Sequence, residues 1–200
     1  MLQVSGLSFD YDDKPLLGDL SFAVHPGTVL HVRGKNGAGK TTLLKLLAGL
    51  YEPQQGTIFF HGSPILTDRA SYQNQLCYLG QKTGLSPLLT LRENYQMGLL
   101  HRFHNITLQQ AAKQLRLEDL LDTCCGALST GQLRRASLLR LLIAKTQLWL
   151  LDEPFNGLDD KAVNHLIDII SQHIAQKGMV VLASHQTFPI LNDLTEEYCL

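Results

Sequence analysis

A glycine-rich octet, residues 34–41, has the residue types needed to bind a chain of phosphates. Its sequence, GKNGAGKT, fits the pattern GxxxxGK[ST] and lies between an expected strand over 29–32 and an expected helix over 41–50. Glycines let the backbone approach a ligand, and the backbone amides and the helix N-terminus favour an anion. Lys40 would reach the β- and γ-phosphate oxygens, and the Thr41 hydroxyl would bind Mg²⁺. An ordinary glycine-rich turn is the alternative, but the full pattern in this context favours a nucleotide site.

Two acidic residues follow an apolar run further along the chain. Residues 148–151 read LWLL and precede Asp152 and Glu153. If the run is a buried parallel strand, both acids lie at its carboxyl end, where ligands bind in such sheets. Asp152 suits the Mg²⁺ shell, and Glu153 could orient or deprotonate a water molecule that attacks the γ-phosphate. The alternative is a solvated acidic turn before Pro154, and the phosphate loop makes that alternative the weaker one.

A third segment, LSTGQ at residues 128–132, forms a Ser-Gly turn before an expected helix. By itself such a segment is most often a helix N-cap made by Ser129. Its amides could also bind an anion. The position between the two nucleotide motifs favours the second interpretation.

The hydrophobic pattern indicates which elements position these residues. We expect short N-terminal strands, a helical insert and then alternating strands and helices, which is typical of a parallel sheet. The expected strands cover about 7–9, 20–24, 29–32, 57–60, 148–151 and 179–183, and the expected helices 41–50, parts of 90–121, 130–145 and 161–177.

Composition limits the class of protein. The chain has 200 residues, 44% of them hydrophobic, and a net charge of −1, which fits a folded domain and argues against a dedicated nucleic-acid binder. No apolar run approaches the roughly 20 residues of a membrane span. Asp10, Asp12 and Asp13 argue against a secretory signal. The four cysteines lack metal-site spacing, and we expect packing residues or surface thiols.

The order of these segments resembles the ATP-binding cassettes of the ABC family, over nearly the whole chain. LSTGQ resembles the LSGGQ signature, and residues 156–159, NGLD, resemble the D-loop. Tyr11 matches the aromatic residue that stacks on adenine, Gln81 the Q-loop glutamine and His185 the switch histidine. Each of the three has a plain structural alternative: strand packing, a polar strand end and a helix start, respectively. Together and in family order they favour the resemblance.

The resemblance implies an α/β fold: a P-loop NTPase cassette with a RecA-like parallel-sheet core, an N-terminal antiparallel β subdomain and a small α-helical subdomain. It implies a single ABC ATP-binding domain over 1–200, with the helical subdomain at about 85–135. ATP and Mg²⁺ would be the cofactors, with Mg²⁺ bound through Thr41, Gln81 and Asp152. The implied catalytic residues are Glu153, His185 and Gln81. The implied ATP-binding residues are Tyr11, Gly34, Lys35, Asn36, Gly37, Ala38, Gly39, Lys40, Thr41 and Thr42. A second copy would contact that ATP in a head-to-tail homodimer through Ser129, Thr130, Gly131 and Gln132.

Three local features resemble, more narrowly, the ATP-binding subunits of heme exporters in cytochrome c maturation. They are SYQN at 71–74 with LGQ at 79–81, LW at 148–149 with EPF at 153–155, and SHQ at 184–186. This resemblance implies an ATPase that powers heme handling and release of a heme-loaded chaperone. It would lie peripherally on the cytoplasmic face of the bacterial inner membrane, with integral membrane subunits of the CcmB and CcmC type. We expect no direct heme ligand, since no CxxCH occurs. The near-zero net charge leads us to expect no nucleic-acid partner.

Two positions depart from the family pattern, and three alternatives stay open. Thr130 stands where the signature usually has glycine, and Asn156 replaces a small D-loop residue, so the hydrolysis rate and communication between sites could differ. The alternatives are the ATPase of another small ABC transporter, a non-transport ABC ATPase and a regulatory nucleotide-binding module without catalysis.

Overall fold

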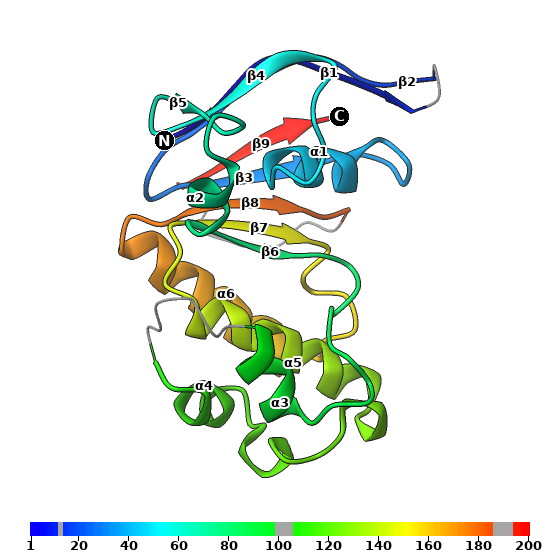
Figure 1. Cartoon of the computed structure of the whole chain (residues 1–200), viewed down its shortest axis with the longest axis vertical. Helices are drawn as coiled ribbons and strands as arrows, with labels where there is room; N and C mark the ends of the chain where they lie inside the picture. The colour runs from blue at the N-terminus through cyan, green and yellow to red at the C-terminus, as the bar shows by residue number, and fades with distance from the viewer. Residues whose placement is uncertain (12–13, 99–105, 186–193) are drawn as a thin grey trace. The chain divides into compact units, whose positions relative to one another are not determined.

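The computed structural model describes residues 1–11, 14–98, 106–185 and 194–200 (Figure 1). The chain forms two compact units. The first comprises Met1–Tyr78, Thr146–Pro154 and Ile170–Leu200, and the second Leu79–Lys145 and Phe155–Ile169. The chain therefore passes from one unit to the other more than once.

The first unit contains an antiparallel sheet in the order β2-β1-β4-β5. These strands are β1 (Leu2–Tyr11), β2 (Lys14–Val24), β4 (Gln55–Phe60) and β5 (Ser63–Pro64). β1 pairs with both β2 and β4, and its apolar residues Leu2, Val4 and Leu7 are buried while Gln3 and Ser5 are exposed. This alternation is that of a sheet with one face in the core, and it confirms the expected antiparallel β subdomain.

The same unit contains a five-stranded sheet in the order β6-β7-β8-β3-β9. Its strands are β3 (Val29–Arg33), β6 (Leu76–Leu79), β7 (Leu148–Asp152), β8 (Met179–Ala183) and β9 (Thr195–Cys199). β8 pairs in parallel with β7 and β3, and every residue of β7 and β8 is buried. Continuous burial is typical of parallel strands covered on both faces. The expected parallel core is confirmed.

Strands β6 and β9 and the short helix α2 (Arg69–Gln73) are absent from the sequence-based expectation. β6 has only four residues, and β9, sequence TEEYC, lies at the sheet edge and is mostly exposed or half-buried. β6 is an apolar run of the minimum length for a strand, and β9 presents neither an apolar run nor strong alternation.

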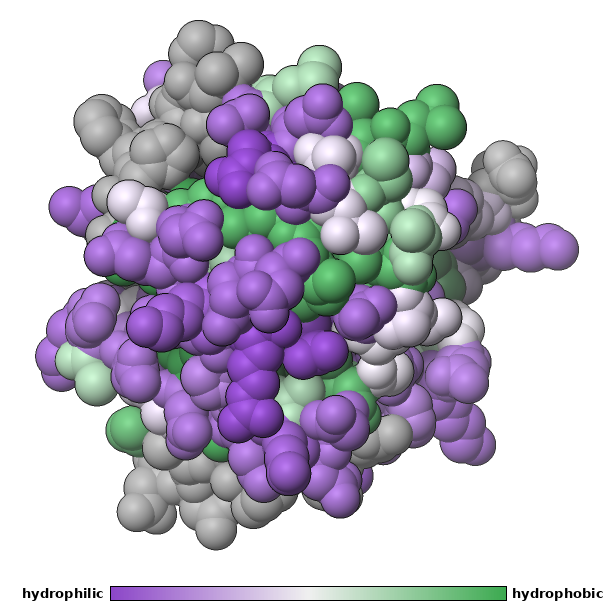
Figure 2. All heavy atoms as spheres, turned by 90° about the horizontal axis from the view of Figure 1, so that it is seen from below, coloured by the Kyte–Doolittle hydropathy of each residue, from purple (hydrophilic) through white to green (hydrophobic). Residues whose placement is uncertain are grey.

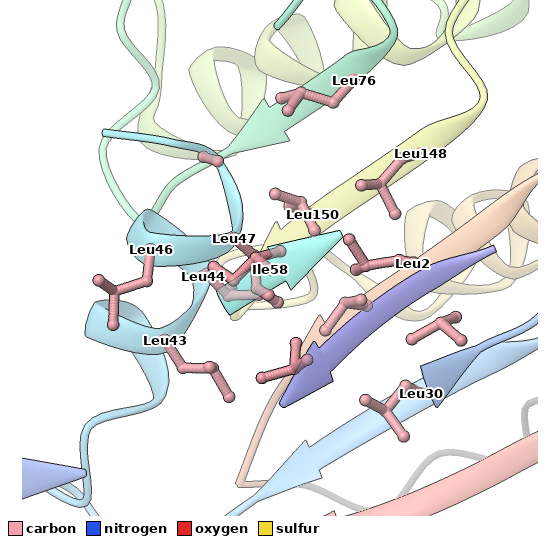
Figure 3. Packing of buried hydrophobic residues seen from close by; sticks show 14 of the residues in the cluster. Leu2, Leu30, Leu43, Leu44, Leu46, Leu47, Ile58, Leu76, Leu148 and Leu150 are labelled. Carbon is pink, nitrogen blue, oxygen red and sulfur yellow. The ribbon is translucent and has the colours of Figure 1, made fainter. Parts of the chain in front are cut away.

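Helix α1 (Lys40–Leu47) follows the phosphate loop and packs against β7 and β8. Its leucines lie in an apolar cluster with residues of both sheets, among them Leu2, Ile58 and Leu150 (Figure 3). The helix is shorter than the expected 41–50 because the chain turns at Gly49, whose φ is +66°.

The described part of the second unit is mainly helical. It contains α3 (Leu91–Gly98), α4 (Leu108–Gln114), α5 (Thr130–Ile143), the short 3₁₀ turns η1 (Glu118–Leu120) and η2 (Cys125–Ala127), and the larger part of α6 (Asp160–Ala175). The Tyr95 hydroxyl of α3 donates to the Ala136 carbonyl of α5 over 2.6 Å. This bond joins α3 to α5, α4 packs against α5, and the expected helical subdomain is present.

The surface, the helices and the cysteines agree with what the composition led us to expect. Figure 2 shows a face on which hydrophilic residues predominate, with hydrophobic residues between them. None of the helices, over the residues described, is long and apolar enough to cross a membrane. Cys77 and Cys125 are buried, and Cys124 and Cys199 are exposed, as expected for packing residues and surface thiols.

Candidate functional site

The phosphate loop connects β3 to α1 in the first unit. Gly37 and Gly39 adopt φ values of +85° and +98°, which other residues adopt only with strain. A Cβ on Gly39 would lie 2.6 Å from Cδ2 of Leu17, so any side chain here would require Leu17 to shift. The buried Lys40 ammonium donates hydrogen bonds to the carbonyl oxygens of Gly34 at 2.7 Å and Lys35 at 3.2 Å. The lysine side chain thus lies against the loop, whose remaining members are Asn36, Ala38 and Thr41.

The loop and the acidic segment meet in this unit. The Thr41 hydroxyl donates a hydrogen bond to Oδ2 of Asp152 over 2.7 Å. Asp152, the last residue of β7, is fully buried. β3 and β7 both pair with β8 in parallel, so their carboxyl ends lie at the same edge of the sheet. A hydroxyl and a carboxylate oxygen therefore converge beside the phosphate loop.

Glu153 has an unusual backbone conformation, with φ of +46°. Its N–H donates to the Ala183 carbonyl at the end of β8, over 2.8 Å. Both of its carboxylate oxygens lie within hydrogen-bond distance of Nδ1 of His185, at 3.0 and 3.1 Å. The carboxylate is buried, whereas 49% of the His185 side chain is exposed. A non-glycine residue in this conformation costs free energy, and such residues cluster at functional sites.

Aromatic residues lie at the end of β1. Tyr11 is 44% exposed and packs edge-on against Phe9 and Tyr51, with ring centroids 5.2 and 6.4 Å apart. Hydrogen bonds with Tyr11 and Lys45, in that order, lower the pKa of Tyr51. The sequence did not point to Tyr51, because this aromatic residue after a helix belongs to no recognisable motif.

A buried histidine, His31 of β3, was also not found from the sequence. Its Nε2 has no hydrogen-bond partner in the described structure. Burial lowers its pKa, while a backbone hydrogen bond at Ser184 and the charges of Glu197 and Glu153 act in the opposite direction. A single histidine in an apolar strand gives no functional signal, and only the packing places it near the charge of Glu153.

The signature residues and Gln81 belong to the second unit. Ser129 is the N-cap of α5 in a reciprocal capping box: its Oγ accepts the Gln132 N–H at 3.2 Å, and Oε1 of Gln132 accepts the Ser129 N–H at 2.8 Å. Thr130 is the first residue of α5. Gln81 is exposed. Nη1 of Arg134 donates a hydrogen bond to the carbonyl of the preceding residue, Gly80, over 3.0 Å. The Ser129 cap has the N-terminal geometry expected from the sequence.

Comparison with known proteins agrees with this geometry. A family model described as "ABC transporter" matches residues 17–156. The chain belongs to the ABC transporter family. It therefore has the ATP-binding cassette fold that the motifs predicted, and the resemblance stated from its sequence is confirmed.

Within the ABC family, the chain is similar to proteins named for cytochrome c biogenesis. The chain is 46% identical to the "Cytochrome c biogenesis ATP-binding export protein CcmA" of Legionella pneumophila (strain Paris), covering all of both chains. It is 36% identical to the protein of that name from Yersinia pseudotuberculosis serotype I (strain IP32953), over 100% of this chain and 93% of the other. The narrower resemblance to cytochrome c maturation cassettes is thereby confirmed.

Solved structures share the ABC cassette fold. An ATP-binding subunit of an ABC transporter has a TM-score of 0.84 and 28% identity, over 92% of this chain and 79% of the other. A dimeric ATP-binding cassette in a post-hydrolysis state, bound to ADP and Pi, has a TM-score of 0.82, over 93% of this chain and 88% of the other. At 20% identity, the second likeness concerns the fold alone.

Proposed function

We propose that the chain is the ATP-hydrolysing subunit of an ABC complex that handles heme in c-type cytochrome biogenesis and powers release of a heme-loaded chaperone. Residues 1–200 act as one ABC ATP-binding domain, with a helical subdomain at about 85–135. The observation that carries the ATPase part is the pair of contacts at one sheet edge, Thr41 with Asp152 and Glu153 with His185.

The residues of the phosphate loop bind the triphosphate of ATP. Amides of residues 34–42 surround the phosphates at the N-terminus of α1, and Lys40 contacts the β- and γ-phosphate oxygens. The exposed Tyr11 ring stacks on the adenine base. Glu153 accepts a proton from the attacking water or orients it, and His185 holds the carboxylate and contacts the γ-phosphate.

The residues present fit Mg²⁺. Thr41 and Asp152 bring a hydroxyl and a carboxylate oxygen within 2.7 Å of each other, and Mg²⁺ prefers oxygen ligands. Gln81 would supply a third oxygen. When bound, Mg²⁺ neutralises charge on the β- and γ-phosphates.

The signature acts on the nucleotide of a second copy. Ser129 and Gly131, at the N-terminus of α5, offer a hydroxyl and backbone amides to the γ-phosphate held by the partner copy, in a head-to-tail dimer with Thr130 and Gln132 beside them. A solved cassette of the same fold is described as a dimer bound to ADP and Pi. Hydrolysis would remove the contacts that favour the closed dimer.

The names of the relatives support the proposed cargo and membrane partners. Proteins at 46% and 36% identity are named for cytochrome c biogenesis and export. We therefore assign integral membrane partners of the CcmB and CcmC type and a peripheral position on the cytoplasmic face of the bacterial inner membrane. We propose heme as the cargo of the complex, and the chain itself carries no CxxCH motif.

The first experiment tests hydrolysis. ATP turnover by the purified chain is measured for wild type and Glu153→Gln, with Glu118→Gln, an exposed acid of η1, as the matched control. We expect Glu153→Gln to lose at least about a hundred-fold in turnover and Glu118→Gln to match wild type. Equal turnover by wild type and Glu153→Gln would refute the role of Glu153.

The second experiment tests the cargo. Deletion of the gene is followed by measurement of heme covalently attached to periplasmic c-type cytochromes, with complementation by wild type or Glu153→Gln. We expect loss of attached heme and rescue by wild type alone. Unchanged cytochromes would instead favour the ATPase of another small ABC transporter.

A further inference from the structure

The second unit contains a cavity of about 440 Å³ outside the nucleotide site. It is lined by the C-terminal end of α4, the first half of α5 and the N-terminal half of α6. Its size lies within the range of small-molecule sites. No residue proposed for ATP binding or hydrolysis lines it.

Three cationic side chains line this cavity from three different segments: Arg116 after α4, Arg135 on α5 and Lys161 on α6. Arg135 donates from Nη1 to the Leu115 carbonyl at 3.5 Å, a long contact. None of the three forms an ion pair with any residue that the structure describes. Cationic groups gathered without carboxylate partners favour binding of an anion.

The acidic residues of the cavity do not neutralise these cations. Asp159 uses its Oδ1 to accept the Ala162 N–H at 2.8 Å, as the cap of the first turn of α6. Asp168 also lines the cavity, but it forms no ion pair within the described residues. Three cations against two carboxylates leave an excess of positive charge.

A fourth group adds a polar atom that lacks a partner. Nε2 of His165 is buried and forms no hydrogen bond in the described part of the chain, and His165 lines the same cavity. A buried polar atom without a partner costs free energy unless a ligand or water satisfies it. Because His165 lines the cavity, a turn of its ring would let Nε2 donate this hydrogen bond to an anion oxygen there.

We propose that this cavity binds a phosphate group, carried either by a small soluble molecule or by a phospholipid headgroup. Arg116 and Arg135 offer planar guanidinium groups that match phosphate oxygens, Lys161 adds a point charge, and Nε2 of His165 completes the set. The proposal is independent of the assigned cargo. A ligand held there would link α4, α5 and α6, because each helix or its end supplies one of these groups.

The test measures phosphate binding at His165 while the nucleotide site is filled. The ring signals of His165 are followed by NMR in the full chain with saturating ADP, during titration with inorganic phosphate. The variants are Arg116→Gln/Lys161→Gln, Arg116→Lys and Lys113→Gln. Lys113 is the matched control, since it is an exposed cation of α4 that does not line the cavity.

We expect the His165 ring signals of wild type to shift saturably with phosphate, and Lys113→Gln to bind phosphate with unchanged affinity. The affinity should be at least tenfold weaker in the double variant and largely retained in Arg116→Lys. Equal binding by wild type and the double variant, or no binding by wild type to either probe, would overturn the proposal. Co-sedimentation with vesicles of phosphatidylglycerol, against phosphatidylcholine alone, distinguishes the two sources. If the double variant no longer binds the vesicles, the ligand of the cavity is a phospholipid headgroup. If the double variant still binds them, the cavity does not bind a headgroup.

Discussion

The hydroxyl of Thr41 donates a hydrogen bond to the carboxylate of Asp152 over 2.7 Å, although the two residues are 111 positions apart in the chain. The bond joins the end of the phosphate loop to the end of a buried strand. It forms because β3 and β7 both run parallel to β8, which brings their carboxyl ends to one edge. The proposed Mg²⁺ site depends on this register.

Asp152→Asn tests the proposed Mg²⁺ site. Asparagine keeps the shape and one oxygen but removes the negative charge from a fully buried position. We expect the Mg²⁺ affinity of the nucleotide-bound chain to fall at least about tenfold, with ATP turnover falling in parallel. Asp160→Asn, at the exposed start of α6, is the control. Unaltered Mg²⁺ dependence in Asp152→Asn would show that this carboxylate is no ligand.

His185→Ala tests the contact with Glu153. Removal of the imidazole leaves the buried carboxylate without its Nδ1 partner at 3.0 Å. We expect turnover to fall by about a hundred-fold, whereas ATP affinity, measured by equilibrium binding, changes little. His25→Ala, an exposed histidine, should behave as wild type. If ATP affinity falls as much as turnover, His185 serves binding and not the chemical step.

The pH dependence of folding stability tests the buried His173. Burial lowers its pKa from an ordinary value of 6.5 to about 4, outweighing two backbone hydrogen bonds. Between these values the unfolded chain binds more protons than the folded chain. The contribution of the neutral His173 to the free energy of unfolding is therefore complete above pH 6.5 and is lost as the pH falls toward 4. We expect about 2–3 kcal/mol of such loss. Denaturant unfolding of wild type and His173→Phe should diverge as the pH falls, and parallel curves would contradict the prediction.

Gly178→Ala tests the packing around the same ring. His173 stacks on Trp149 with centroids 3.8 Å apart, and a Cβ on Gly178 would lie 2.2 Å from Nε2 of His173. Because the stacked ring has little room to move, we expect a loss of about 1–3 kcal/mol in the free energy of unfolding. Gly18→Ala is the control, since nothing lies within 4 Å of its added Cβ. The double variant Gly178→Ala/His173→Ser should recover part of the loss.

Ser129 has a structural role as a helix cap and a proposed role in the dimer, and two variants distinguish these roles. Ser129→Ala removes the acceptor of the Gln132 N–H and should cost about 1 kcal/mol of stability. Thr107→Ala removes the equivalent capping box of α4 and should cost about the same. In a Glu153→Gln background with ATP, we expect only Ser129→Ala to lose the dimer on a sizing column. A dimer that survives Ser129→Ala would argue against the signature contact.

Local patterns predicted much of the fold. The apolar runs of β7 and β8, the helix after Gly39 and the Ser129 cap lie where the sequence predicts them, because each depends on neighbouring residues. β6 and β9 did not show in the pattern. Their backbone hydrogen bonds are satisfied by partner strands far along the chain. The apolar run of β6 has only four residues, and the side chains of β9 show little periodicity.

By itself, the sequence determined the candidate groups: a phosphate loop, two carboxylates after a buried strand, a histidine and a capped helix. The tertiary structure decided which of them meet. The strand order brings Thr41 to Asp152 and Glu153 to His185, and only packing reveals the buried His31 and the cationic cavity. Motif spacing follows from local geometry, whereas these contacts depend on sheet register and side-chain packing between distant segments.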